Sequence, residues 1–350
     1  MKVISFGELL LRLAAPGYSK LFQRDSLETT FCGGEANVAV SLAIFGYQSE
    51  FITKLPDSDV GYAAANALRY FGVNVDNIIF GEGRMGLYYL EKGAAQRPSK
   101  VIYDRKFSAI SLADSDEFKW KEILNDANWF HWTGINPALS ENLFETSLDA
   151  CQAAKKRGIT ISCDLNYRSK LWTSEEAKEK MEQILPLVDI CICNEEDAEK
   201  VLGIKAEHTN INSGELNKDG YVQVAREIHK KFGCRYVATT LRRSYSASRN
   251  GWSAMLYEAE KDKAYFSTEY NIQIVDRVGG GDSFSAGIIY ALCENMSGQK
   301  AIEFATASSC LKHTIEGDFN RTTIEDVYNL MNSGGNGRVL RYSTYKDKSQ

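Results

Sequence analysis

Short apolar runs alternate with longer amphipathic stretches along most of this chain. Residues 159–164 (Ile-Thr-Ile-Ser-Cys-Asp) follow a helical pattern that ends in the basic residues and glycine of 155–158. Residues 189–193 (Asp-Ile-Cys-Ile-Cys) precede the acidic sequence 194–197, which is typical of a helix start. This βαβ rhythm predicts an α/β fold in which helices cover both faces of a mostly parallel sheet.

Two segments, 11–33 and 84–108, interrupt this pattern. They are polar, rich in tyrosine and extended in character, and residues 86–91 and 100–105 predict two strands joined by a polar turn. We expect a small sheet outside the main layers that covers the ligand crevice; an edge hairpin without such a role is the alternative. The predicted domains are an αβα domain of residues 1–10, 34–83 and 109–345 and a β-sheet lid of residues 11–33 and 84–108.

A second hairpin is predicted around Asn250 and Gly251. An Asn-Gly pair favours a two-residue type I′ turn, and here it lies between the extended segments 246–248 and 252–256. We therefore expect the chain to reverse direction at this pair.

The composition favours a globular protein that acts on a small molecule. Of its 350 residues 44% are hydrophobic, which is enough for a substantial core. The formal net charge is -5 and no long Lys/Arg run occurs, which argues against a nucleic-acid partner. No apolar run approaches the roughly 18 residues of a membrane span, and the N-terminal strand lacks the features of a signal peptide. We expect a cytoplasmic protein without a membrane partner.

Several common catalytic sites are absent from the sequence. The eight cysteines are scattered, with no Cys-x-x-Cys pair and no Cys/His cluster at zinc spacing, so we expect reduced, buried thiols. None of the four histidines combines with Ser or Cys in a recognisable hydrolase triad, and there is no Gly-x-Ser-x-Gly elbow. The chain also lacks a Gly-x-x-x-x-Gly-Lys-Ser/Thr loop, so its phosphate site is not of the P-loop type.

Residues 276–284 contain a junction that is suited to holding an anion. An extended apolar run ends there, Gly279, Gly280 and Gly281 follow, and a helical pattern begins at Asp282. Glycine N–H groups can turn towards an anion, and the following helix points its positive end the same way. An aspartate beside such a site suits a general base in phosphoryl transfer. A flexible loop with an aspartate cap on a core helix is the alternative.

Three polar segments follow predicted strands, namely residues 164–168, 194–197 and 279–282. Ligands of open α/β sheets bind at the carboxyl ends of the strands. We therefore expect these segments to share one site.

Four motifs occur in the order and approximate spacing of a known family: Gly-Gly-Glu-Ala-Asn at 33–37, Asp-x-Asn-x-Arg at 164–168, Asn-x-x-Asp at 194–197 and Asp-x-x-Gly-Gly-Gly-Asp at 276–282. Over nearly its whole length the chain resembles the ribokinase-like (PfkB) carbohydrate kinases. Within that family it is most similar to the 2-keto-3-deoxygluconate kinases, through residues 52–56, the Tyr-x-Arg of 103–105 and residues 311–318.

The resemblance implies a ribokinase-like three-layer αβα sandwich with a small β-sheet lid. The implied reaction is ATP-dependent phosphorylation of the terminal primary hydroxyl of a sugar acid, 2-keto-3-deoxygluconate, to its 6-phosphate. A fructokinase or another ribokinase-like sugar kinase is one alternative, and a catalytically silent sugar-binding relative is another. Related kinases pair through the edges of the lid, so a homo-dimer or higher homo-oligomer is expected.

The same resemblance implies roles for the residues of the reaction centre and the sugar pocket. Asp282 would take the proton of the sugar hydroxyl, while the N–H groups of the three glycines, Gly279, Gly280 and Gly281, stabilise charge on the phosphoryl group. The implied sugar pocket consists of Gly33, Gly34, Asn37, Tyr89, Tyr103, Arg105 and Arg168.

The choice of sugar-pocket residues rests on two further arguments. Tyr88 and Tyr89 point to opposite faces of a strand, and we predict that Tyr89 reaches the sugar. Arg105 and Arg168 suit a carboxylate, because a guanidinium binds it through two parallel hydrogen bonds. A solvated position in a polar hairpin is the alternative for Arg105.

The implied cofactors are ATP, Mg²⁺ and K⁺. The nucleotide-binding residues would be Asn194, Thr240 and Arg242 together with Gly279 and Gly281. Asp197 and Glu196 would hold Mg²⁺ through water, and Asp276 would lie at a monovalent-cation site. Acids that only complement a helix dipole are the alternative for 194–197. The chain departs from the family at 240–246, which lacks the glycines of Thr-x-Gly-x-x-Gly, and at Asp197, where relatives carry Glu.

Overall fold

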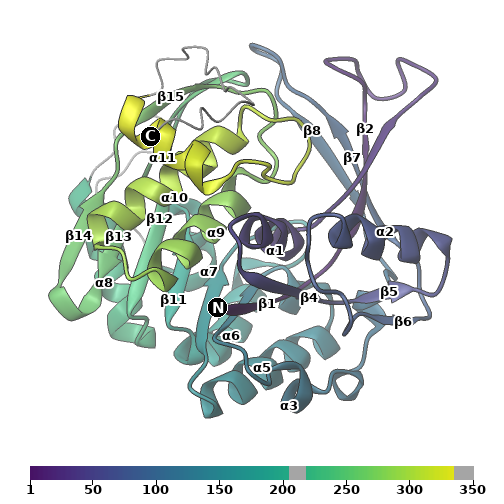
Figure 1. The fold of residues 1–350 in the computed structure, drawn as a ribbon, viewed down its shortest axis with the longest axis horizontal. Helices are drawn as coiled ribbons and strands as arrows, with labels where there is room; N and C mark the ends of the chain where they lie inside the picture. Colours follow the sequence, from purple (N-terminus) through teal and green to yellow (C-terminus); the bar gives the residue numbers. More distant parts are fainter. Residues whose placement is uncertain (205–217, 335–350) are drawn as a thin grey trace, which may run out of the picture.

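The centre of the molecule is a large twisted sheet, shown in Figure 1. The computed structural model describes residues 1–204 and 218–334, and within these ranges the sheet has nine strands. Their order is β14-β13-β12-β11-β10-β9-β1-β4, with β15 paired to β13. The strands are β1 (Lys2–Phe6), β4 (Gln48–Ile52), β9 (Trp129–Thr133), β10 (Thr160–Asp164), β11 (Ile190–Cys193), β12 (Tyr236–Ser246), β13 (Arg249–Glu258), β14 (Lys263–Phe266) and β15 (Tyr270–Gln273).

The strands from β4 to β12 are parallel to their neighbours, whereas β13 runs antiparallel to β12, β14 and β15. Every residue of β9 and of β11 is buried. A parallel strand covered on both faces needs this continuous apolar character, because neither face is solvated. The predicted mostly parallel sheet is therefore confirmed.

Helices cover both faces of this sheet and enclose one apolar core on each side. One layer consists of α1 (Gly34–Ile44), α9 (Gly280–Cys293), α10 (Gly298–Lys312) and α11 (Ile324–Ser333). The other consists of α5 (Glu141–Lys156), α6 (Ser174–Ile184), α7 (Glu195–Leu202) and α8 (Lys218–Phe232). Shorter or peripheral helices are α2 (Asp59–Arg69), α3 (Trp120–Ile123) and α4 (Asn136–Leu139). The three-layer αβα sandwich expected from the sequence is confirmed.

A separate four-stranded sheet projects from one side of the sandwich (Figure 1). Its order is β3-β2-β7-β8, and the predicted strand pair at 86–91 and 100–105 is present as the antiparallel pair β7 and β8. Its strands are β2 (Leu10–Ala14), β3 (Glu28–Cys32), β7 (Gly86–Glu91) and β8 (Lys100–Asp104), and we refer to them as the lid sheet. A third, two-stranded sheet joins β5 (Lys54–Pro56) to β6 (Ile79–Gly81). Residues 335–345, the end of the predicted αβα domain, lie outside the described residues.

The hairpin predicted around Asn250 and Gly251 exists, but its turn is elsewhere. The chain reverses between β12 and β13 at residues 247–248, and Asn250 and Gly251 pair with Ser244 and Arg243 inside the ladder. Asn250 is buried, and a Cβ at Gly251 would lie 2.7 Å from a carboxylate oxygen of Glu269. The glycine therefore serves a close side-chain approach within a strand, and the predicted turn position is wrong.

No helix in the described part of the chain has the length and apolar character of a membrane span. All eight cysteines are free thiols, and seven of them are buried.

Candidate active site

A cavity of about 320 Å³ lies at the carboxyl ends of the parallel strands, between the sandwich and the lid sheet. The first turns of α1 and α9 and the ends of β10 and β11 form its walls. Most of the residues predicted for the site line this one cavity: Gly33, Gly34, Asn37, Tyr103, Arg105, Arg168, Asn194, Asp197, Thr240, Gly279, Gly281 and Asp282.

Asp282 occupies the first turn of α9 and is half-buried in the cavity wall. Asn37 of α1 donates a hydrogen bond from Nδ2 to its Oδ2 at 2.6 Å. Burial raises the pKa of Asp282 to about 6, against the opposing effects of the Asn37 hydrogen bond and of the positive charge of Arg168. A carboxylate with this pKa is ionised at neutral pH and still basic enough to accept a proton.

The three glycines before Asp282 differ in what they provide. Gly279 adopts a left-handed conformation with φ +83°, and a Cβ there would overlap the carbonyl oxygen of Asp318. A Cβ at Gly280 would overlap the ring of His313, and the N–H of Gly280 donates to the carbonyl of Arg277 at 3.3 Å. Around Gly281 there is open space.

Residues 279–282, which we term the glycine cradle, therefore open towards the cavity at Gly281. The first turn of a helix offers main-chain N–H groups that have no acceptor within the helix. Together with the positive end of the α9 dipole, these groups can hold phosphoryl oxygens. Gly280 is not among the residues that line the cavity, so its role is to let His313 pack closely.

Acidic side chains form another part of the cavity wall. Asp197 closes a capping box with Asn194 at the start of α7, and its carboxylate accepts hydrogen bonds from the N–H groups of Tyr167 (3.0 Å) and Asn194 (3.2 Å). Burial raises the pKa of Asp197 to about 6. Burial, with the charges of Asp197 and Asp282, also raises the pKa of Asp164.

The described residues contain no group of three or more acidic, His or Cys side chains arranged to bind a metal ion directly. Glu196, predicted as a Mg²⁺ residue, is exposed and does not line the cavity. Asp164, Asn194 and Asp197 do line it, and a set of oxygen donors of this kind fits a hydrated Mg²⁺ that arrives with phosphate groups.

The lid sheet contributes Tyr88 to the cavity in place of the predicted Tyr89. Tyr88 is buried, donates its hydroxyl to Asp318 at 2.7 Å and packs on Tyr103 with ring centroids 5.7 Å apart. Tyr89 lies on the opposite face of β7, where its ring approaches Phe22. Successive side chains of a strand point to opposite faces, so only one of the two can reach the site. The predicted choice between them was the wrong one.

Arg105 is only 8% exposed and lies between a ring and a carboxylate. Its guanidinium stacks over Tyr103, 4.3 Å from the ring centroid, and its Nε lies 3.4 Å from a carboxylate oxygen of buried Glu8. Burial raises the pKa of Glu8, whereas the charge of Arg105 acts against this rise. Arg105 is therefore a fixed cation in the wall of the cavity.

A neighbouring cavity of about 660 Å³ shares Tyr103, Arg105 and Arg168 with the first. Four basic residues line it against one acid, Asp104; they are Arg105, Lys106, Arg168 and Lys170. The end of the site that was predicted to bind the sugar is therefore positively charged.

Two further predicted residues, one for the nucleotide and one for a monovalent cation, do not line the cavity. Arg242 is exposed on β12 and does not line the cavity, in contrast to Thr240 on the same strand. Asp276 is buried beneath the cradle, and its carboxylate lies 2.6 Å from a guanidinium nitrogen of Arg12. The Asp276 side chain is therefore already paired with a cation of the chain.

Two cavity residues were overlooked when roles were assigned from the sequence. Asn166 has φ +40°, is buried, and its Oδ1 has no hydrogen-bond partner among the described residues. A strained residue with an unpaired polar atom at a cavity is a candidate ligand contact. Its place in the Asp-x-Asn-x-Arg motif was a usable signal. Asp318, the last residue of the 311–318 match, was given no role there, yet it lines the cavity and accepts a hydrogen bond from Tyr88.

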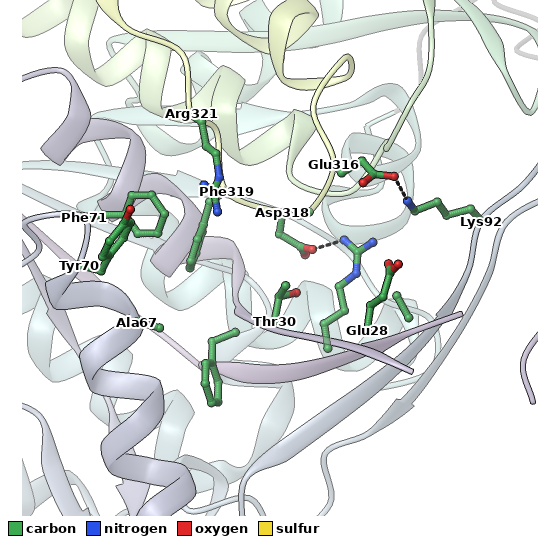
Figure 2. Close-up of a pocket in the computed structure, with 14 residues that line it drawn as sticks. Glu28, Thr30, Ala67, Tyr70, Phe71, Lys92, Glu316, Asp318, Phe319 and Arg321 are labelled. Carbon is green, nitrogen blue, oxygen red and sulfur yellow. Dashed lines mark hydrogen bonds and ion pairs between the residues drawn. The ribbon is translucent and has the colours of Figure 1, made fainter. Parts of the chain in front are cut away.

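A third cavity, of about 520 Å³, lies on the other side of Asp318 (Figure 2). Figure 2 shows Tyr70, Phe71 and Phe319 on one side of it and the ion pair of Lys92 with Glu316 on the other. No sequence pattern indicated this cavity. Asp318 lines both this cavity and the 320 Å³ cavity and thus lies between the two.

Comparison with known proteins identifies the relatives of this architecture. A solved structure of a 2-dehydro-3-deoxygluconokinase from Thermotoga maritima superimposes with a TM-score of 0.91 at 48% identity, covering 95% of this chain and 99% of that one. A 2-dehydro-3-deoxygalactonokinase from Haloferax volcanii is 33% identical over 96% of this chain and 98% of its own length. A 2-dehydro-3-deoxygluconokinase from Bacillus subtilis is 25% identical over 91% of this chain and 92% of its own length.

The family comparison agrees with these relatives. Residues 1–322 match the model of the family described as pfkB family carbohydrate kinase. This range includes the cavity, the glycine cradle and the lid sheet. The chain therefore belongs to the pfkB family of carbohydrate kinases.

Proposed function

We propose that this sugar kinase transfers the terminal phosphoryl group of ATP to the terminal hydroxyl of 2-dehydro-3-deoxygluconate, the compound also named 2-keto-3-deoxygluconate. The names of the Thermotoga maritima and Bacillus subtilis relatives support this substrate. The observation that carries the proposal is the position of Asp282, hydrogen-bonded to Asn37 at the open end of the glycine cradle.

The proposed chemistry needs a base and a site for developing negative charge. Asp282 accepts the proton of the sugar hydroxyl as that oxygen attacks phosphorus. The N–H groups of the glycine cradle and the α9 dipole stabilise the charge on the phosphoryl oxygens. Because the transition state of phosphoryl transfer is loose, positioning and charge stabilisation supply most of the rate enhancement.

The basic side chains that line the two adjoining cavities suit a sugar that carries a carboxylate. Buried Arg105 and exposed Arg168 both line the two adjoining cavities. A buried carboxylate requires a paired cation, whereas a neutral ketose would require only hydroxyl partners. We assign the substrate carboxylate to this basic wall, with Gly33, Gly34 and Asn37 close to the sugar hydroxyls.

We assign the nucleotide to the part of the cavity beside Asn194 and Thr240. Mg²⁺ would neutralise phosphate charge there when bound. Asp164 and Asp197 would hold its waters, because the carboxylate of Asp197 already accepts two main-chain hydrogen bonds.

We further propose that residues 11–33 and 84–108 act as a lid that excludes water, and that the lid also joins two copies of the chain. The edge strands β3 and β8 leave unpaired main-chain groups, and Val101, Ile102 and Tyr103 of β8 are each at least 40% exposed. A sheet edge with exposed apolar side chains favours pairing with another chain. The eight free thiols agree with a reducing, cytoplasmic location.

A substrate screen with ATP tests the proposed function. ADP release should depend on 2-dehydro-3-deoxygluconate, with its C4 epimer 2-dehydro-3-deoxygalactonate as the matched sugar acid and fructose as the neutral sugar. A preference for fructose would contradict the proposed substrate and identify the protein as a fructokinase. Thermal stabilisation by a sugar without ADP release would identify a silent relative.

A further inference from the structure

The side chain of Lys312, the last residue of α10, is fully buried behind the glycine cradle. Its exposed fraction is 0%, and Nζ donates hydrogen bonds to the carbonyl oxygens of Asp276 (3.3 Å) and Ile315 (3.2 Å). Its Cε lies 3.1 Å from the position that a Cβ would take at Gly279. The ammonium group thus joins the segment before the cradle to the segment that follows α10.

A second buried cation belongs to the same cluster. Arg12 of β2 is 3% exposed and pairs with the carboxylates of both Asp276 and Asp318. Burial lowers the pKa of Lys312, but the charges of Asp276 and Asp318 oppose this effect. Two cations and two carboxylates therefore balance each other beneath the cradle.

A monovalent metal ion does not fit the position that the sequence predicted for it. K⁺ binds in proteins through carbonyl and carboxylate oxygens. Here the Asp276 carboxylate is occupied by Arg12 and by the N–H groups of Val278 and Gly317, and its carbonyl accepts from Lys312. A further cation would bring uncompensated charge into a buried site, which is costly.

We propose that Lys312 is the built-in monovalent cation of this kinase, a positioning residue that fixes the glycine cradle and makes turnover independent of K⁺. The inference rests on the proposed function, because it concerns the phosphoryl-transfer site. Lys312 fixes the position of the cradle, because its ammonium group joins the carbonyl of Asp276 to that of Ile315. Its charge adds to the positive end of α9, where phosphoryl charge develops.

The wild-type protein provides the first test. Initial rates in K⁺, NH₄⁺ and tetramethylammonium salts of equal ionic strength should differ by less than about twofold, because the site already holds its cation. Activation by K⁺ of about tenfold or more over tetramethylammonium would overturn the proposal.

Two variants separate charge from volume. Lys312→Ser leaves a cavity beside both carbonyls, whereas Lys312→Met removes the charge and fills the space. Both should lose about tenfold or more in kcat in tetramethylammonium. NH₄⁺ or K⁺ should restore Lys312→Ser but not Lys312→Met. Exposed Lys156 provides the control, and Lys156→Met should match the wild type in every salt. Unchanged kcat in both variants, or no rescue of the serine variant, would overturn the proposal.

Thermal unfolding gives a readout that does not depend on turnover. K⁺ and NH₄⁺ should raise the Tm of Lys312→Ser relative to tetramethylammonium and leave the Tm of the wild type unchanged. If no sugar supports ADP release but this stabilisation pattern holds, the proposed function fails and the cation assignment survives. A wild-type Tm that rises specifically with K⁺ would contradict the assignment.

Discussion

Asn37 and Asp282 are 245 residues apart in sequence and joined by a 2.6 Å hydrogen bond. The contact links the first turns of α1 and α9, the two helices that begin at the cavity. Asn37 engages only Oδ2 of Asp282, so Oδ1 stays available for a substrate hydroxyl. The orientation of the proposed base is therefore set by a residue from the other end of the chain.

Replacing Asp282 with Asn tests its role as the base. We expect kcat to fall by about 10²–10⁴-fold, the range supplied by general-base catalysis. Sugar and nucleotide affinities, measured by calorimetry, should change little because the side chain keeps its size. A variant that retains near-normal kcat would remove Asp282 from the mechanism.

The pH dependence of kcat/KM should show an acidic limb near pH 6. Burial raises the pKa of Asp282 to about 6, so the carboxylate gains a proton and activity falls as the pH drops through this value. Asn37 favours the ionised form, so Asn37→Ala should move the limb to higher pH. Since burial also raises the pKa of Asp197 to about 6, Asp197→Asn is the necessary control. If the acidic limb disappears in Asp197→Asn and does not move in Asn37→Ala, it reports the protonation of Asp197 and not of Asp282.

Arg105 should distinguish sugar acids from neutral sugars. In Arg105→Met we expect kcat/KM for the sugar acid to fall by about 10- to 100-fold, in line with a lost charge-assisted hydrogen bond. Fructose turnover, where detectable, should fall far less.

Stability has to be controlled in this experiment, because Arg105→Met leaves the carboxylate of Glu8 buried without its partner. The double variant Glu8→Gln/Arg105→Met restores charge balance and should show the same loss of specificity. Equal losses for acidic and neutral sugars would place the substrate carboxylate elsewhere.

Two cradle glycines should respond differently to an added methyl group. Gly281→Ala points a side chain into open space, so it should raise KM for ATP with little change in Tm. Gly279→Ala should lower the free energy of unfolding by more than about 1 kcal/mol, because alanine at φ +83° is strained and overlaps the Asp318 carbonyl. Circular dichroism melts and ATP titrations of the pair provide the measurement. The reverse pattern would mean that Gly281 has a structural role.

The lid edge predicts the assembly state. A dimer or larger assembly is expected in light scattering at micromolar concentration. Ile102→Lys should dissociate it, since a lysine on an edge strand opposes pairing. Ile102 is 41% exposed, so the substitution should leave the Tm of the monomer nearly unchanged. A wild-type monomer would rule out pairing through β8.

The sequence predicted those features of the site whose structure is determined by a short segment on its own. The glycines and Asp282 lie at a strand-to-helix junction, and the acidic start at Asn194 forms a capping box with Asp197. Neither feature depends on distant residues. The parallel sheet followed in the same way from continuous apolar runs such as β11.

The sequence did not predict features that depend on packing between distant segments. The strand pattern allowed either Tyr88 or Tyr89 to face the site. The side that faces it is determined by a distant segment, because Tyr88 donates a hydrogen bond to Asp318. Asn250 and Gly251 carry a turn signal, yet β15 and Glu269 pack against them and extend the ladder past that pair. Arg12 offered no signal for its ion pairs, because they join a lid strand to a segment more than 260 residues away.

The lid sheet is anchored to the sandwich at two places along its length. Arg12 ties β2 to Asp276 and Asp318, and Lys92, just after β7, ties the next strand to Glu316 at 2.7 Å (Figure 2). Removing either partner of a buried pair such as that of Arg12 costs several kcal/mol, so a wholesale swing of this sheet about its base is unfavourable. The phosphate-binding end of the crevice should therefore keep its shape through every catalytic cycle.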